Sequence, residues 1–185
     1  MRAAGSGRLA LAGRRRLDGQ GPPGWRKKGP NPTDRAKPGT KRSLIVERSG
    51  GPLGAVVAGA NIHDAKLLAD TIEAIVVARP DPAAYSQHLC LDKGYDNPSG
   101  KGAAADGGYI PHIRRIGEEK LDEQGEKRHP ARRWVVELML AWLSKCRAIL
   151  IRDDKKPTNY LGLMQLACAL LWYRRLHRLQ EADAN

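Results

Sequence analysis

Three carboxylates stand where they could take part in metal-dependent chemistry. Asp92 follows a short apolar run, Glu137 lies in a segment of helical periodicity, and Asp18 lies in a Leu-Asp-Gly turn. Carboxylates that are distant in sequence but close in space bind Mg²⁺, which prefers hard oxygen ligands and leaves coordination positions for water and phosphate. Two such ions activate the attacking oxygen and stabilise the leaving oxygen in phosphodiester cleavage. The three acids are therefore candidate catalytic and metal-binding residues.

Each acid also has a purely structural interpretation. Asp92 could be a turn residue, and Asp18 could be a solvated turn residue in a flexible segment. Glu137 could be an exposed helix residue that pairs with Arg133 four positions earlier, a contact worth only about 0.3 kcal/mol. Asp64 is better explained as a helix-capping residue than as a metal ligand. Residue type and spacing alone leave these alternatives open.

Composition limits the kind of protein that holds these acids. The 185 residues include 32 lysines and arginines against 20 aspartates and glutamates, which gives a net charge of +12. A hydrophobic fraction of 41% is sufficient for the core of a single domain. Three cysteines without a CxxC pair argue against a disulfide scaffold or a cysteine-ligated zinc site and favour the reducing cytoplasm. The longest nearly apolar stretch, 161–173, is too short to cross a membrane.

The positive charge is concentrated near the N-terminus. Residues 1–42 hold 12 lysines and arginines and two aspartates, a net +10 that leaves +2 for the remaining residues. Because this region is also rich in glycine and proline, we expect residues 1–28 to form a basic arm, either disordered or a degraded first strand, before a domain at 29–180. Such an arm could follow a DNA backbone, or it could be a solvated leader without a partner.

Hydrophobic patterning predicts a mixed α/β fold. Apolar, β-branched runs on either side of a Gly-Gly step predict a β-hairpin at 41–59, and helical spacing predicts a helix at 64–79. Short apolar runs predict strands at 87–91 and 109–113. The first of these strands ends at Asp92, at the carboxyl edge where open α/β sheets place their chemistry.

Two further helices are expected, the first after residue 130 and the second at 159–179. In the first, six apolar residues fall within about a 100° sector and leave Glu137 and Arg133 on the opposite, polar side. These six residues are Val135, Leu138, Met139, Trp142, Cys146 and Ile149. We therefore expect this helix to pack beside the strand that ends at Asp92.

Five segments form an ordered series of motifs. They are GPNPTDRAKPGTKR at 29–42, GANIHD at 59–64, LCLDKGYD at 89–96, RRWVVELMLAWL at 132–143 and NYLGLMQLACALL at 159–171. Together they resemble the bacterial insertion-sequence transposases of the DDE class, in the branch formed by insertion-sequence family five. The resemblance is nearly continuous from residue 21 to residue 176, so it is far more specific than any single short motif.

The resemblance implies an α/β, RNase H-like fold, with a mixed sheet flanked by helices, that is incomplete at its N-terminus. Members of the family carry a helical DNA-binding domain before the first catalytic aspartate, whereas 17 residues precede Asp18 here. We therefore interpret the chain as the C-terminal, catalytic portion of a transposase from a truncated or frame-shifted element.

The same resemblance assigns roles to the three acids. Asp92 matches the second acid, in an Asp-x-Gly-Tyr motif, and Glu137 matches the third, with Arg133 as its upstream arginine. Asp18 is the candidate for the first acid, but it lies a few residues closer than usual to the next motif. Leu138 follows Glu137 where the family usually has an arginine, so one basic DNA-facing position is missing. The candidate DNA contacts are Arg133, Lys93, Lys27, Lys28, Arg35, Lys41 and Arg42.

The implied function is DNA transposition. It comprises binding of transposon-end DNA, metal-dependent cleavage and strand transfer into target DNA, with two Mg²⁺ held by Asp18, Asp92 and Glu137. Mn²⁺ could replace Mg²⁺, and the active species would be a homodimer. The alternative is a catalytically inactive remnant that only binds DNA. An unrelated RNA-binding protein is less consistent, because Trp134 and Trp142 lie in apolar helical contexts rather than among arginines.

Overall fold

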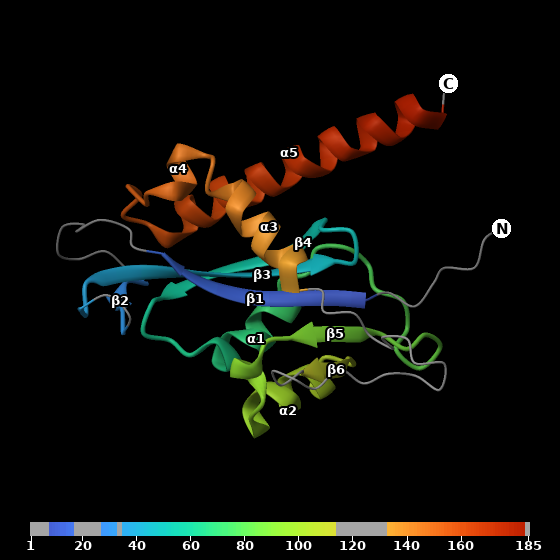
Figure 1. Ribbon diagram of the computed structural model, residues 1–185, viewed down its shortest axis with the longest axis horizontal. Helices are drawn as coiled ribbons and strands as arrows, with labels where there is room; N and C mark the ends of the chain where they lie inside the picture. The colour runs from blue at the N-terminus through green and yellow to red at the C-terminus, as the bar shows by residue number, and fades with distance from the viewer. Residues whose placement is uncertain (1–7, 17–26, 33–34, 114–132, 184–185) are drawn as a thin grey trace.

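The computed structural model describes residues 8–16, as strand backbone, and residues 27–32, 35–113 and 133–183 (Figure 1). The strands in these ranges are β1 (Arg8–Arg16), β2 (Gly29–Pro30), β3 (Pro38–Glu47), β4 (Pro52–Gly59), β5 (His88–Leu91) and β6 (Ile110–Ile113). The helices are α1 (Asp64–Glu73), α2 (Pro98–Asp106), α3 (Arg133–Leu143), α4 (Arg147–Leu150) and α5 (Pro157–Asp183), and a 3₁₀ turn, η1 (Lys93–Tyr95), follows β5.

The strands form a mixed sheet with the order β4-β3-β1-β5-β6. β1 runs antiparallel to β3 and parallel to β5, β5 runs parallel to β6, and the short β2 pairs with the start of β3. β3 and β4 confirm the hairpin predicted at 41–59. In its turn Gly50 has a φ of 94°, and the Glu47 carboxylate accepts hydrogen bonds from the amides of Ser49 (2.7 Å) and Gly51 (2.8 Å).

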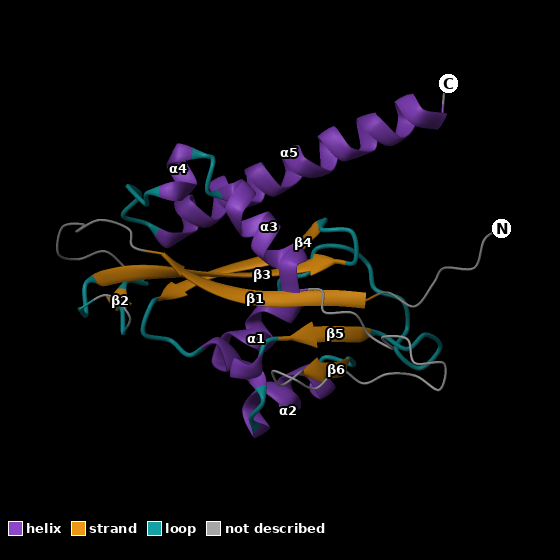
Figure 2. Cartoon of the chain, viewed as in Figure 1, coloured by secondary structure: helices purple, strands orange, loops and turns teal. Residues whose placement is uncertain are grey.

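Helices cover both faces of the sheet and give the molecule three layers (Figure 2). We call the face covered by α3, α4 and α5 the α3 layer, and the face covered by α1 and α2 the α1 layer. The alternation of strand residues divides the core between them. In β3, Leu44 and Val46 pack in the α3 layer, whereas Ile45 packs in the α1 layer. In β5, Cys90 faces the α3 layer and Leu89 the α1 layer.

β1 lies in the centre of the sheet, inside the region that the sequence assigns to an arm. Residues 8–16 pair with both β3 and β5, so the boundary expected at residue 28 does not separate an arm from the sheet. Of the two alternatives for this region, a strand is what the structure shows for residues 8–16. The sequence does not indicate this strand clearly, because it ends in three consecutive arginines. In the sheet Arg14 stands opposite Arg42 and Arg15 opposite Lys41. Like charges in directly opposed positions destabilise a strand pair.

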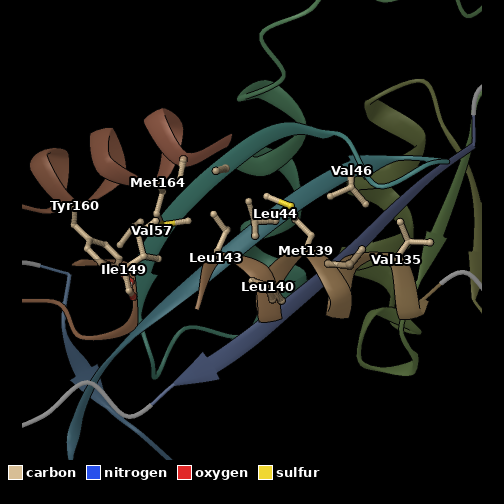
Figure 3. Close-up of a cluster of buried hydrophobic side chains, with 13 residues drawn as sticks. Leu44, Val46, Val57, Val135, Met139, Leu140, Leu143, Ile149, Tyr160 and Met164 are labelled. Carbon is tan, nitrogen blue, oxygen red and sulfur yellow. The ribbon is translucent and has the colours of Figure 1, made fainter. Parts of the chain in front are cut away.

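α3 packs onto the sheet through a different face from the predicted one. Its buried residues are Val135, Val136, Met139, Leu140 and Leu143, whereas Leu138 is 59% exposed. Figure 3 shows Leu140 and Leu143 directed towards the strands, near Leu44. The prediction included Cys146 and Ile149, but α3 ends before them, and α4 begins after Cys146. The predicted apolar face was wrong because it counted Cys146 and Ile149 as part of the same helix, which shifted its centre towards Leu138.

α1 begins and ends through specific hydrogen bonds. His63 caps its start, because its Nδ1 accepts a hydrogen bond from the amide of Ala65 (3.2 Å). The helix ends at Glu73, earlier than predicted, because the amide of Val76 bonds instead to the carbonyl of Leu53 in β4 (3.1 Å). The segment that follows α1 is therefore tied to the edge of the sheet.

α5 is the longest of the described helices, with 27 residues. Its first half packs over β4 beside α3 and α4. Further along, Trp172 donates to the carbonyl of Pro52 and Arg175 to the Glu47 carboxylate, and the C-terminal end of the helix projects beyond the sheet (Figure 1). Among the helices of the described ranges, none is both long and apolar enough to cross a bilayer.

Candidate functional site at the carboxyl end of β5

Asp92 is fixed at the carboxyl end of β5 by a structured turn. Its backbone is extended (φ −75°, ψ 161°), and its carboxylate accepts a hydrogen bond from the amide of Lys93 (2.6 Å), where η1 begins. The buried ring of Tyr95 anchors this turn in the α1 layer. The side-chain amide of Asn97 donates to the carbonyl of Gly94 (2.9 Å), and its oxygen caps α2. The motif that resembles the second catalytic acid therefore holds Asp92 in a hydrogen-bonded turn at the carboxyl end of β5.

Glu137 comes from α3, which packs on β1 and β3 in the α3 layer, and its side chain is exposed. Cys90 faces the α3 layer, so the alternation of β5, continued through the extended backbone of Asp92, assigns Asp92 to that face as well. Asp18, the candidate for the first acid, lies outside the described residues. Within the described part of the chain, no group of three His, Cys, Asp or Glu side chains could hold a metal ion.

Lys41 and Arg42 are buried, which disagrees with their expected role as DNA contacts. Lys41 is 0% exposed, and its ammonium group pairs with the Asp64 carboxylate (3.0 Å) and donates to the carbonyl of Ile62. The Arg42 guanidinium donates to the carbonyl of Ile149 (3.3 Å). The alternation of β3 directs the two cations into opposite layers of the core, so neither is available to a phosphate group.

The remaining expected DNA contacts differ in exposure. Lys27, Arg35 and Lys93 are exposed, and Lys28 is half-buried. The side chain of Arg133 lies outside the described residues. The expected DNA contacts therefore divide into two structural cations inside the core and three that are exposed to solvent.

A buried arginine joins two segments that carry exposed lysines. The guanidinium of Arg152 donates to the carbonyls of Lys27 (3.4 Å), Asp154 (2.9 Å) and Lys155 (3.1 Å) and to the hydroxyl of Thr40 (3.0 Å). Arg152 is 1% exposed, whereas the side chains of Lys27, Lys155 and Lys156 are exposed. We call these three lysines the lysine cluster. Sequence spacing places Lys27 far from the other two, so only the Arg152 contacts reveal the cluster.

Tyr95 has a hydroxyl that is buried without a hydrogen-bond partner among the described residues. Burial raises the pKa of Tyr95, and the negative charges of Asp64 and Asp92 raise it further. The phenol therefore stays neutral at physiological pH and is unsuited to proton transfer. Its role at this site is to anchor the turn that carries Asp92.

Two histidines lie close together on neighbouring parallel strands, His88 on β5 and His112 on β6. Nδ1 of His88 is 2.6 Å from Nε2 of His112, and the ring centroids are 4.9 Å apart. The sequence shows no metal-ligand spacing between them and does not predict the contact. It follows from the pairing of β5 with β6, which sets Cys90 opposite His112 and so places His112 close to His88.

The chain is similar to known proteins. A family model described as a transposase DDE domain matches residues 11–172. A putative transposase for insertion sequence element IS402 from Burkholderia cepacia is 33% identical over 159 residues, which cover 84% of this chain and 73% of that protein. A solved structure of the piggyBac transposase synaptic complex with hairpin DNA matches with 12% identity and a TM-score of 0.33, over 66% of this chain and 26% of that one.

Proposed function

The chain belongs to the transposase family defined by the DDE domain. We propose that it binds DNA at the surface formed by the lysine cluster and the neighbouring basic residues 27–37. Members of this family act in DNA transposition, and their chemistry depends on divalent metal ions in general. The observation that carries the proposal is the lysine cluster, which Arg152 holds on a fixed backbone.

The lysine cluster suits a phosphate backbone because its cations come from two segments fixed at one point. Exposed ammonium groups bind DNA phosphates largely through release of counterions, without reading the sequence. Asp153 and Asp154 offset most of the positive charge of their own turn. The excess of positive charge therefore comes from residues 27–37, which contain four cations and one acid. Both segments are needed for the proposed surface.

The salt dependence of DNA binding tests this proposal. Lys155→Gln together with Lys156→Gln should reduce the slope of log K against log salt by about 2, since each phosphate contact contributes about 0.9. Fluorescence anisotropy with a labelled duplex measures the slope. Lys66→Gln is the matched control, because Lys66 is an exposed lysine on α1, in the other layer. An unchanged slope in the double variant would remove the lysine cluster from the interface.

Metal-dependent cleavage and strand transfer is a second candidate function. The placement of Asp92 and Glu137 on the same face supports it. A central strand with one antiparallel and one parallel neighbour, covered by helices on both faces, is consistent with the RNase H-like fold that the resemblance implies. Mg²⁺ would activate water for attack on a phosphodiester. The described residues supply only two carboxylates for it, so the fit of a metal pair is incomplete.

A nicking assay on transposon-end DNA tests the second candidate. Mg²⁺-dependent nicking by the native chain that disappears in Glu137→Ala would support it, whereas nicking that survives this change would exclude Glu137 from the site. The family resemblance also implies a homodimer on paired DNA ends. Analytical ultracentrifugation with and without end DNA would show whether two copies assemble.

A further inference from the structure

We infer that a metal site at Asp92 lacks its partner carboxylate at position 12 of β1, so that the described residues do not hold a pair of divalent metal ions there. The inference rests on the second candidate function, because Asp92 is a metal-site residue only if the fold carries the cleavage chemistry. DNA binding by the lysine cluster is independent of it, so either property can fail without the other.

The register of two neighbouring parallel strands identifies the residue beside Asp92. β1 pairs with β5 so that Ala10 stands beside Cys90. A parallel register advances by one residue on both strands, so two residues further along Ala12 stands beside Asp92. Neighbouring strands lie about 4.8 Å apart. Carboxylates at that separation can share ions that are themselves roughly 3.5–4 Å apart.

The backbone register also assigns position 12 to the correct face of the sheet. β1 pairs with β3 so that Ala12 stands opposite Leu44, and opposed residues of antiparallel strands project from the same face. Leu44 packs in the α3 layer, as does Cys90, whose alternation Asp92 continues. A carboxylate at position 12 would therefore project beside Asp92 and towards the helix that carries Glu137.

The register of β1 gives the level of Asp92 to Ala12 and not to Asp18, which itself lies outside the described residues. β1 continues from Ala12 to Arg16, four further residues that span about 13 Å of strand, and Asp18 comes after that end. A slip of β1 that brought Asp18 to the level of Asp92 would place Arg16 opposite Val46, which is fully buried in the core. Burying an unpaired arginine is costly, so the hydrophobic pattern fixes the register. Its residue at the level of Asp92 is an alanine, which offers no metal ligand.

Supplying the missing carboxylate and measuring metal binding directly tests this inference. In the full chain, Ala12→Asp should bind Mn²⁺ at least tenfold more tightly than Ala12→Asn, which has the same shape without the charge, in calorimetric titrations without DNA. Its thermal midpoint should rise with Mn²⁺, because an ion that binds the folded state stabilises it. A further Asp92→Asn change should remove both effects. Equal Mn²⁺ binding by the Asp and Asn variants would overturn the inference.

A second measurement does not depend on how well a new carboxylate is tolerated. The native chain should bind Mn²⁺ weakly, and Asp18→Asn should leave that binding unchanged. A tenfold loss of Mn²⁺ affinity in Asp18→Asn would make Asp18 a ligand and would also overturn the inference. DNA binding should be the same in the native chain and in Asp18→Asn, apart from the small effect of one charge, so this result is distinct from failure of the lysine cluster.

Discussion

Asp64→Asn should destabilise the protein, because it leaves the ammonium group of Lys41 buried without a counter-charge. Lys41 is 0% exposed, and its Nζ lies 3.0 Å from Oδ1 of Asp64. At this distance and an effective dielectric constant of about 20, the attraction is roughly 5 kcal/mol. The Asp64 side chain is 23% exposed, so water offsets part of the loss. We expect the free energy of unfolding to fall by about 3 kcal/mol, the lower end of the range for a broken buried pair.

Urea unfolding followed by far-UV circular dichroism measures this change. The matched control is Asp96→Asn, which removes a 2.6 Å ion pair with Lys101, whose side chain is 56% exposed. That control should cost less than about 1 kcal/mol. Lys41→Met in the Asp64→Asn background removes the unpaired charge and should recover most of the loss. It would not recover a contribution from the acidic residue at the start of α1, so the two causes are separable. A loss in Asp64→Asn as small as that of the control, or no recovery with Lys41→Met, would refute the argument.

Three further predictions concern buried polar groups. Tyr95→Phe should leave the free energy of unfolding unchanged or raise it by up to about 1 kcal/mol, because the hydroxyl is buried without a partner among the described residues. Tyr160→Phe should lower it by about 1 kcal/mol, because that hydroxyl donates to the carbonyl of Ile149 at 2.7 Å. Equal urea midpoints for the two variants would contradict at least one of these two predictions. Burial raises the pKa of the Cys168 thiol to about 11, and the thiolate is the reactive form, so alkylation by iodoacetamide should still accelerate about tenfold per pH unit above pH 9. Mass spectrometry measures the rate, and a plateau near pH 9 would exclude the raised pKa.

The elements that the sequence predicts correctly are those with a local pattern. The hairpin at 41–59 has two apolar runs and a glycine turn, and the strand before Asp92 has a short apolar run with a polar end. α2 has no clear apolar period, because it is rich in glycine and alanine, so hydrophobic spacing gives only a weak indication of a helix there. The signal that could have found it is Asn97 followed by Pro98, a helix cap and a favoured first residue.

The features that the sequence does not predict depend on partners far along the chain. β1 contains three consecutive arginines, and its pairing with β3 and β5 gives it a place in the sheet that its own composition does not indicate. Lys41 and Arg42 read as surface cations, but Asp64 and Ile149 supply their partners inside the core. Their charges are therefore used in folding, and the number of lysines and arginines overestimates the surface available to DNA.

The candidate site shows why a motif locates some of its residues and not others. Asp92 lies in the turn that follows β5 and Glu137 lies in α3. Each belongs to a motif of consecutive residues, so motif spacing along the sequence is sufficient to propose both. The first acid is held only by the pairing of β1 with β5, where each residue of displacement moves a side chain about 3.3 Å and turns it to the opposite face. Asp18 is close to the expected spacing along the chain, yet the register assigns that place to Ala12. Metal coordination depends on distances across the sheet, so the register of β1 against β5 decides whether the proposed set of acids is complete.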